Sequence, residues 1–540
     1  MPADEPAGAS SAPPAGPPTA KPVSPWAPLG SAVFRALWIA VLLSNIGTWM
    51  QTVGAQWLLV SGPRASVLVS LVQAASSLPV LLFALPAGVL AEFMDKRRLL
   101  LATQLFQTVV GAVLALLTAF GSVSPSLLLV LTFLLGAGAA VQLPAYQAVI
   151  PELVPRAQLT GAAALGSISV NLARAVGPAI AGLVISWLGV AAVFAINAAT
   201  FLAFAAVLLW WHPEPVDRPH PEAFLGALRA GGRYVGHSPV VRRVMLRLVL
   251  FIVPASALWA LLPLIASDRL DIGSGGYGLL LGALGVGSLL GAVVLPRLRR
   301  LWSPTMLLTL ASLGFGLALL VVGLVRVPWL VIVVLVPTGV AWIMVLSSLN
   351  ATVQGFLPRW VRARGLSIYQ VVLFGATAGG SVLWGLVAGP VGLPGTFVIG
   401  AALLLAGAAS SRLLPLHDVA GVDRSQAPAW SDPQLVLDPG DNPGPVLVTV
   451  EYRVPAERFD ELMEGLAWVR GSRLRTGATS WHSYRDAEQP DRIVEQFTVP
   501  SWEEHLRQHD GRLTGFDQEH LDRVRALSDP PPSVSHLFSV

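Results

Sequence analysis

Long apolar runs separated by short polar breaks dominate this sequence up to residue 414. Twelve runs are long enough to cross the ~30 Å hydrocarbon core of a bilayer, which takes about 20 helical residues. They lie at residues 34–60, 65–91, 99–120, 126–149, 163–187, 189–211, 244–267, 275–296, 304–325, 328–350, 365–388 and 393–414. The pattern predicts an all-α polytopic membrane protein with twelve transmembrane helices.

Composition supports this class. Hydrophobic residues make up 54% of the 540-residue chain and charged residues only 12%, with a mean hydropathy of +0.66. Soluble proteins carry about 25% charged residues. The chain has no cysteine, which excludes disulfides, thiolate metal sites and cysteine nucleophiles. It also has no G-x-x-x-x-G-K-[ST] sequence, so nothing indicates ATP-driven transport by this chain.

Basic residues are divided unevenly between alternate loops. One set of loops holds Lys96, Arg97, Arg98, Arg156, Arg229, Arg233, Arg242, Arg243, Arg297, Arg299, Arg300, Arg359, Arg362 and Arg364. The other set holds only Arg64, Arg269 and Arg326. Because basic loops stay on the cytoplasmic side, we expect the first set and both termini to be cytoplasmic, in the inner membrane.

Two landmarks recur at similar spacing and predict an internal repeat. Gly88 and the basic residues after it are echoed about 203 positions later at Gly291. The segment IPELVPRAQLTG at 150–161 is echoed by LPRWVRARG at 357–365, about 207 positions later. A parallel repeat of this kind predicts two six-helix halves with a substrate site near the midplane between them.

The composition changes after the twelfth run. VLVTVEYRV alternates like a half-buried strand, and the segments after it read as helix, strand, strand, helix and strand. The order β-α-β-β-α-β predicts a small ferredoxin-like α+β domain. The predicted units are a disordered cytoplasmic tail (1–30), the N-terminal half (31–211), a cytoplasmic and partly amphipathic-helical linker (212–243), the C-terminal half (244–414), a second linker (415–445) and the cytoplasmic α+β domain (446–540).

A dense cluster of charges, GVLAEFMDKRR, separates the second and third runs. It resembles the loop signature G-x-L-A-D-R-x-G-R-K/R of the major facilitator superfamily and departs from it at Glu92, Phe93 and Asp95. The resemblance implies the major facilitator fold, with a conformational loop that latches one state of transport. The residues assigned to this loop are Gly88, Glu92, Asp95, Lys96, Arg97 and Arg98. The alternative is that the basic residues only set the topology.

One face of the first run is polar. At 100° per residue, five side chains fall within about 100° of arc: Asn45, Thr48, Trp49, Thr52 and Gln56. Polar groups are costly in lipid, so this face should meet other helices or a water-filled path. Two interpretations stay open, namely a substrate path and interhelical hydrogen bonds that hold the bundle together.

Arg174 lies well inside the fifth run, on one face with Asn171. A buried arginine is costly and usually has a partner or a role. Acidic residues of this half lie only in loops, so helix carbonyls, an Asn or an anionic substrate are its candidate partners. We therefore add Asn171 and Arg174 to the predicted substrate path.

The fifth run also holds Gly177, Pro178 and Gly182. These residues resemble the G-P-x-x-G-G antiporter signature of exporters, with Leu183 in place of the last glycine. Gly177 permits close helix approach, and Pro178 removes a backbone hydrogen bond and predicts a kink. An ordinary packing kink is the alternative.

Ionisable groups are scarce elsewhere. No Asp or Glu lies inside a run, so no membrane-embedded proton carrier can be assigned and the coupling ion, a proton among the candidates, stays open. In the last domain His505 and His509 are four residues apart, a spacing compatible with a metal site. Without an H-E-x-x-H pattern we expect surface histidines, with no metal and no other cofactor.

Residues 30–540 together resemble one bacterial branch of the superfamily, the "transmembrane secretion effector" group. The segments that carry this resemblance are NIGTWMQTVGAQWLL, the GVLAEFMDKRR loop, LARAVGPAIAG, PRWVRARGLS and SWEEHLRQHD. The last domain resembles the antibiotic-biosynthesis-monooxygenase type of dimeric α+β barrel.

The resemblance implies a secondary exporter of a small molecule such as a siderophore, natural product or drug. Its partners would be that substrate and the lipid bilayer, with no nucleic acid. The alternatives are a membrane-tethered monooxygenase-like enzyme and a transporter-like sensor. The last domain is expected to be an accessory or dimerisation module rather than an enzyme.

Overall fold

The computed structural model of the protein describes residues 24–212, 231–416 and 444–539, together with 423, 425, 427 and 435–437. Within these residues, eleven helices are long and apolar enough to cross a membrane, which confirms the predicted class. The predicted tail before residue 24, the linker before residue 231 and most of the second linker lie outside the described residues.

The membrane helices begin and end close to the predicted runs. They are α1 (Ala32–Leu59), α2 (Ala65–Phe93), α3 (Lys96–Ala119), α4 (Pro125–Leu153), α5 (Leu159–Leu188), α6 (Val190–Trp210), α8 (Pro239–Leu264), α9 (Ser274–Leu301), α10 (Pro304–Leu324), α11 (Pro328–Phe356) and α12 (Arg359–Ala409). Ser31, Asp95, Ser124, Ser238 and Ser303 cap helix starts by accepting a hydrogen bond from the backbone N–H three residues later.

Helix α12 contains two of the predicted crossings. Gly392 has φ 75° and ψ 164°, a non-helical conformation that divides α12 into two arms. Both arms pack on α8, because Gly380 of the first arm meets Ser256 and Gly407 of the second meets Leu250. The eleven helices therefore supply the twelve predicted crossings.

Two boundaries differ from the sequence prediction. Residues 24–30 were assigned to the tail, but Ala27–Gly30 form a 3-10 helix whose Pro28 is buried. Pro28 packs beside Gly161 near the start of α5. Helix α8 begins at Pro239, inside the predicted linker, because Ser238 supplies its cap.

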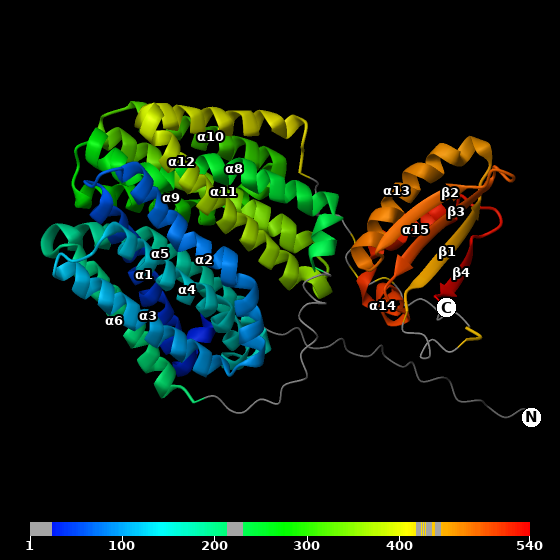
Figure 1. Cartoon of the computed structure of the whole chain (residues 1–540), viewed down its shortest axis with the longest axis horizontal. Coiled ribbons are helices and arrows are strands. Elements are labelled where there is room, and N and C mark those ends of the chain that lie inside the picture. Colours follow the sequence, from blue (N-terminus) through cyan, green and yellow to red (C-terminus); the bar gives the residue numbers. More distant parts are fainter. Residues whose placement is uncertain are drawn as a thin grey trace, which may run out of the picture.

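Figure 1 shows the C-terminal domain beside one end of the helical bundle. We call this the proximal end, and it includes the turn between α2 and α3. The opposite, distal end includes the turn at residues 60–64 between α1 and α2. The two halves contact each other where α5 packs on α9 and where α2 packs on α12.

Small residues bring the two halves together at the distal end. A Cβ on Gly182 would lie 2.6 Å from the Ser274 carbonyl oxygen, and a Cβ on Gly385 would lie 2.7 Å from the Ser70 Cβ. Gly385 lies 203 positions after Gly182, and Ser274 lies 204 positions after Ser70. The two contacts are therefore copies of one another, as the predicted repeat requires.

Two arginines, the half-buried Arg97 and the buried Arg247, each cap the last helix of one half. Arg97 donates to the carbonyl oxygens of Leu208 and Leu209 at the end of α6, at 2.8 and 2.9 Å. Arg247 donates to the carbonyl oxygens of Gly407 and Leu414 around the end of α12, at 2.8 and 2.7 Å. Carbonyls at a helix C-terminus lack intrahelical partners, so both arginines satisfy groups that lipid would leave exposed.

The C-terminal domain has the predicted order of elements. They are β1 (Val446–Arg453), α13 (Phe459–Thr476), β2 (Ser480–Arg485), β3 (Arg492–Val499), α14 (Trp502–Arg507), α15 (Gly515–Arg525) and β4 (Ser533–Phe538). The strands are antiparallel in the order β2-β3-β1-β4, which confirms the ferredoxin-like arrangement. The second helix of this domain was predicted as one continuous segment, SWEEHLRQHDGRLTGFDQEHLDRVRAL at 501–527. That prediction was wrong in extent, because the segment breaks between α14 and α15, where Gly511 has φ 98°.

Glu504 of α14 joins the C-terminal domain to the membrane helices. Arg233, in a short helix at 231–236, donates to Glu504 Oε1 at 3.1 Å. Arg512 donates to both oxygens of Glu504 at 2.6 and 3.0 Å. Its guanidinium carbon also lies 5.0 Å from the ring centroid of Trp360, at the start of α12.

Arg512 and Arg233 keep the Glu504 carboxylate ionised. Burial raises the pKa of this carboxyl, but Arg512 and Arg233 more than offset burial, so its pKa lies below the ordinary value of 4.5. The attraction is therefore present at neutral pH and is lost as the pH falls through that lowered pKa.

We predict that Gly385→Ala destabilises the protein, because the new methyl group would overlap Ser70. The thermal unfolding midpoint in detergent should fall by several degrees, as expected for overpacking that costs ~1–3 kcal/mol. Gly389→Ala in the same helix is the matched control, since nothing lies within 4 Å of its Cβ position. Equal midpoints for the two variants would contradict the close contact.

We predict that Glu504→Gln loosens the C-terminal domain from the helices, because the amide has no charge to offer Arg233 and Arg512. Hydrogen–deuterium exchange should speed up in α14 and in residues 231–236. Glu503→Gln is the control, since Glu503 is 73% exposed and its described ion pair is with Arg507 on its own helix. Unchanged exchange in Glu504→Gln would show that the ion pairs do not hold the domain.

Candidate functional site

The two halves also meet along α1. Gln56 of α1 is buried, and its Nε2 donates to the Trp259 carbonyl oxygen of α8 at 3.3 Å. The Tyr277 hydroxyl of α9 donates to Gln56 Oε1 at 2.7 Å. Trp57 stacks on the Tyr277 ring with 5.9 Å between centroids. Gln56 of the predicted polar face is therefore a contact between halves.

Trp49 lies two helical turns closer to the proximal end. Its ring centroid is 6.0 Å from that of Trp259, so an indole of each half meets the other. The guanidinium carbon of Arg174 on α5 lies 5.6 Å from the Trp49 centroid. Gly177 permits this approach, since a Cβ there would be 2.8 Å from the Trp49 Cβ. Arg174 Nε is buried and has no hydrogen-bond partner among the described residues.

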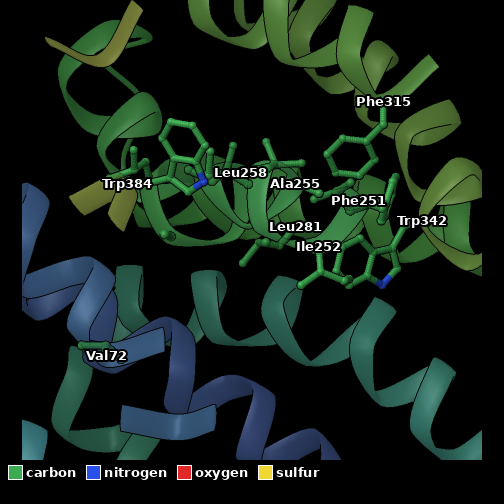
Figure 2. Close-up of a cluster of buried hydrophobic side chains, with 14 of the residues drawn as sticks. Val72, Phe251, Ile252, Ala255, Leu258, Leu281, Phe315, Trp342 and Trp384 are labelled. Atoms are coloured by element: carbon green, nitrogen blue, oxygen red, sulfur yellow. The ribbon is translucent and has the colours of Figure 1, made fainter. Parts of the chain in front are cut away.

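Trp342 of α11 continues this arrangement in the C-terminal half. Its ring centroid lies 5.3 Å from that of Trp259. Figure 2 shows Trp342 beside Phe251 of α8 and Phe315 of α10, whose centroids are 5.9 and 6.1 Å away. We call Arg174, Trp49, Trp259 and Trp342 the indole row.

Trp259 and Trp342 were not predicted as site residues, because neither lies on a polar face recognised in the sequence as Trp49 does. Tryptophan within an apolar run was a usable signal, because its ring is apolar and its N–H still needs an acceptor. Trp384 illustrates the usual outcome, since its Nε1 donates to the Val253 carbonyl oxygen at 2.7 Å.

The other predicted path residues bond within the N-terminal half. Asn45 Nδ2 donates to Ser169 Oγ of α5 at 3.2 Å. The other three donate to a carbonyl four residues earlier in their own helix: Thr48 to Ser44, Thr52 to Thr48 and Asn171 to Ser167. The structure therefore brings Trp49, Gln56 and Arg174 to the contact between halves, and a role of the other four in the path stays a prediction.

The predicted kink residues lie at helix crossings. Gly177 faces Trp49 of α1, and Gly182 faces Ser274 and Gly278 of α9. Helix α5 runs unbroken through Pro178. The structure thus provides the close approach expected of Gly177, and a kink at Pro178 stays a prediction.

The predicted conformational loop is only partly described. Gly88 and Glu92 have helical backbone in α2, but the side chains of residues 88–93 lie outside the described part. Asp95 accepts a hydrogen bond from the Arg98 backbone N–H at 2.8 Å. Lys96 Nζ donates to Glu152 Oε1 of α4 at 2.5 Å. Together with Arg97, these contacts tie α3 to α4 and α6 within one half.

His505 is buried in the C-terminal domain, which corrects the expectation of a surface histidine at this position. His505 is 1% exposed, and its Nε2 lies 3.2 Å from His536 Nε2. Burial, and then His536, lowers the pKa of His505 to about 4. Burial, followed in size by the positive charge of Arg473, lowers the pKa of His509 to about 2. Both rings are therefore neutral at pH 7. Among the described residues, no three His, Cys, Asp or Glu side chains are grouped to hold a metal ion.

Comparison with known families and proteins agrees with this architecture. A family model described as "Transmembrane secretion effector" matches residues 23–540. The staphyloferrin A transporter of Staphylococcus aureus is 25% identical over 51% of this chain and 70% of its own length. The multidrug efflux pump Tap of Mycolicibacterium fortuitum is 26% identical over 66% of this chain and 90% of its own.

The enterobactin exporter EntS of Escherichia coli O1:K1 is 33% identical, over 39% of this chain and half of its own length. Among solved structures, an inward-facing, unoccupied bacterial homologue of the human lysosomal transporter Spinster has a TM-score of 0.56 at 16% identity, covering 71% of this chain and 97% of its own. The nucleoside transporter NupG has a TM-score of 0.58 at 12% identity, covering 71% of this chain and 99% of its own. Both structures have the same fold as the membrane helices described above.

Proposed function

This chain belongs to the transmembrane secretion effector family, and on that basis we propose that it is a secondary active exporter of a small molecule. The names of its relatives include a staphyloferrin A transporter, an enterobactin exporter and a multidrug efflux pump. A siderophore, natural product or drug is accordingly the substrate class we propose, carried by alternating access.

One observation carries this proposal: side chains from both halves face each other beside the two glycine–serine contacts that the internal repeat relates. The glycine–serine contacts at Gly182 and Gly385 close the distal end. Trp49, Arg174 and Trp259 lie on the proximal side of that closure. In folds built from two repeats, substrate binds between the halves while they rock about it. A ligand on these residues would be exposed in turn to each side of the membrane.

The sidedness of the protein is part of the proposal. We place the proximal end and both termini in the cytoplasm and the chain in the inner membrane, supported by the basic residues of the proximal loops. The loop from Gly88 to Arg98 would act as a conformational latch. The coupling ion stays open, with a proton among the candidates. The division into tail, two halves, linkers and C-terminal domain is proposed with the boundaries derived from the sequence, except that the tail ends before the 3-10 helix at Ala27–Gly30 and the C-terminal half begins with α8 at Pro239.

We further propose that the C-terminal domain is an accessory module and not a second enzyme. Its most deeply buried described carboxylate, Glu495, accepts hydrogen bonds from Tyr452, Trp481 and Arg473 at 2.9, 3.0 and 3.3 Å. A carboxylate held by three fixed donors has a structural role rather than a free reactive oxygen. The edge strand β4 exposes Val534 and Leu537, which supports dimerisation through this domain.

We predict that Arg174→Ala abolishes export while the protein still inserts into the membrane. Arg174 contacts Trp49 at the meeting of the halves, and its loss would remove the positive charge there. Export is measured as energised uptake of substrate into inverted membrane vesicles. Arg156→Ala is the control, since Arg156 is exposed in the turn before α5. Full export by Arg174→Ala would exclude the assigned role.

We predict that export survives deletion of residues 446–540, because the membrane halves have their own buried core. The same vesicle assay measures it, and a protonophore should stop uptake in both proteins if a proton gradient drives it. Substrate turnover by the intact chain without any flux would instead favour the tethered enzyme. Saturable binding with neither flux nor turnover would favour the sensor.

A further inference from the structure

Three buried N–H groups of the indole row have no hydrogen-bond partner among the described residues. They are Arg174 Nε, Trp259 Nε1 and Trp342 Nε1. Other buried groups of this kind exist, but these three belong to one continuous series of ring contacts. The series runs from Arg174 to Trp49, Trp259 and Trp342, with separations of 5.6, 6.0 and 5.3 Å.

N–H donors without an acceptor are costly when they are buried among membrane helices. A buried N–H without an acceptor costs ~1–3 kcal/mol, and lipid offers no water to replace the acceptor. Arg97 and Arg247 show how this chain treats other arginines, since both donate to helix-end carbonyl oxygens. Arg174 Nε has no such carbonyl. No Asp or Glu lies inside any apolar run, so a carboxylate of the runs cannot serve as acceptor.

The row therefore lacks acceptors and carries one fixed positive charge. It also offers flat aromatic faces, since Trp49 and Trp259 meet at an interplanar angle of 47° and Trp259 and Trp342 at 59°. Tilted rings leave faces on which a planar group can stack, and a guanidinium beside an indole attracts an anion together with its ring.

We propose that the indole row binds a flat organic anion, an aromatic ring that carries a carboxylate or phenolate. The anionic oxygen accepts from Arg174 Nε, and further oxygens of the ligand accept from the two indole N–H groups. The ring lies against Trp49 and Trp259. This proposal rests on the proposed exporter function, whose substrate class it narrows.

The test compares three probes that share one ring system. They are naphthalene-2-carboxylate, neutral naphthalene-2-methanol and cationic 2-naphthylmethylammonium. Binding to the full chain in phosphatidylcholine nanodiscs is measured by isothermal titration calorimetry. The carboxylate should bind at least about tenfold more tightly than the alcohol, and the cation more weakly than both. No measurable binding of the carboxylate, or equal affinity for carboxylate and alcohol, would overturn the proposal.

Variants assign the preference to the row. Arg174→Gln should bring the affinities for carboxylate and alcohol to within about twofold. Trp259→Phe and Trp342→Phe keep a ring but remove the N–H, so they should weaken carboxylate binding more than alcohol binding. Trp187→Phe is the control, since Trp187 is 78% exposed. Each variant is first checked for an unchanged elution profile and unfolding midpoint, and retention of the full preference in Arg174→Gln would refute the assignment.

This experiment separates the ligand proposal from the exporter proposal, because it measures binding without flux. If the protein binds the anion through Arg174 but does not export, the proposed anion site is supported and the proposed exporter function is refuted. Export in a protein without a preference for the carboxylate would sustain the exporter and remove the anion site.

Discussion

The paired glycine–serine contacts at the distal end set the geometry of the whole membrane region. Gly182 with Ser274 and Gly385 with Ser70 are related by the internal repeat, so the halves meet at two equivalent points. A side chain at either glycine would push helices of opposite halves apart. Because backbones touch there, Trp49 and Trp259 come within ring contact and Arg174 lies beside them.

In these apolar surroundings, the arginines differ in whether their N–H groups reach a carbonyl oxygen that can accept a hydrogen bond. Arg97 and Arg247 lie near helix ends, where carbonyl oxygens lack partners, and each fixes the last helix of its half. Arg174 lies in the middle of α5, where Pro178 frees only the carbonyl of Arg174 itself and the others accept intrahelical bonds, and its Nε donates to none of them. One residue type therefore has two outcomes, and what separates them is whether the C-terminus of a neighbouring helix lies within reach of the guanidinium.

Much of the fold was predictable because it depends on periodicity and length. The apolar runs, the repeat and the β-α-β-β-α-β order are local patterns, and Trp49 and Arg174 stood out by residue type. The burial of His505 and the contacts of Trp259 depend on partners distant in sequence. Local patterns contain no information about such partners. Positions 88–93, the most family-like segment, have side chains outside the described part, so their predicted roles stay predictions.

Helix α12 links the C-terminal domain to the glycine–serine contacts at the distal end. Arg512 lies over Trp360 and shares Glu504 with Arg233 of the segment that precedes α8. The first arm of α12 runs unbroken from Trp360 to Gly385, about 38 Å at 1.5 Å per residue. If this arm moves as one unit, separation of Gly385 from Ser70 also moves its Trp360 end relative to the N-terminal half. Arg233 and Trp360 both contact the C-terminal domain, so both keep these contacts only if they move together.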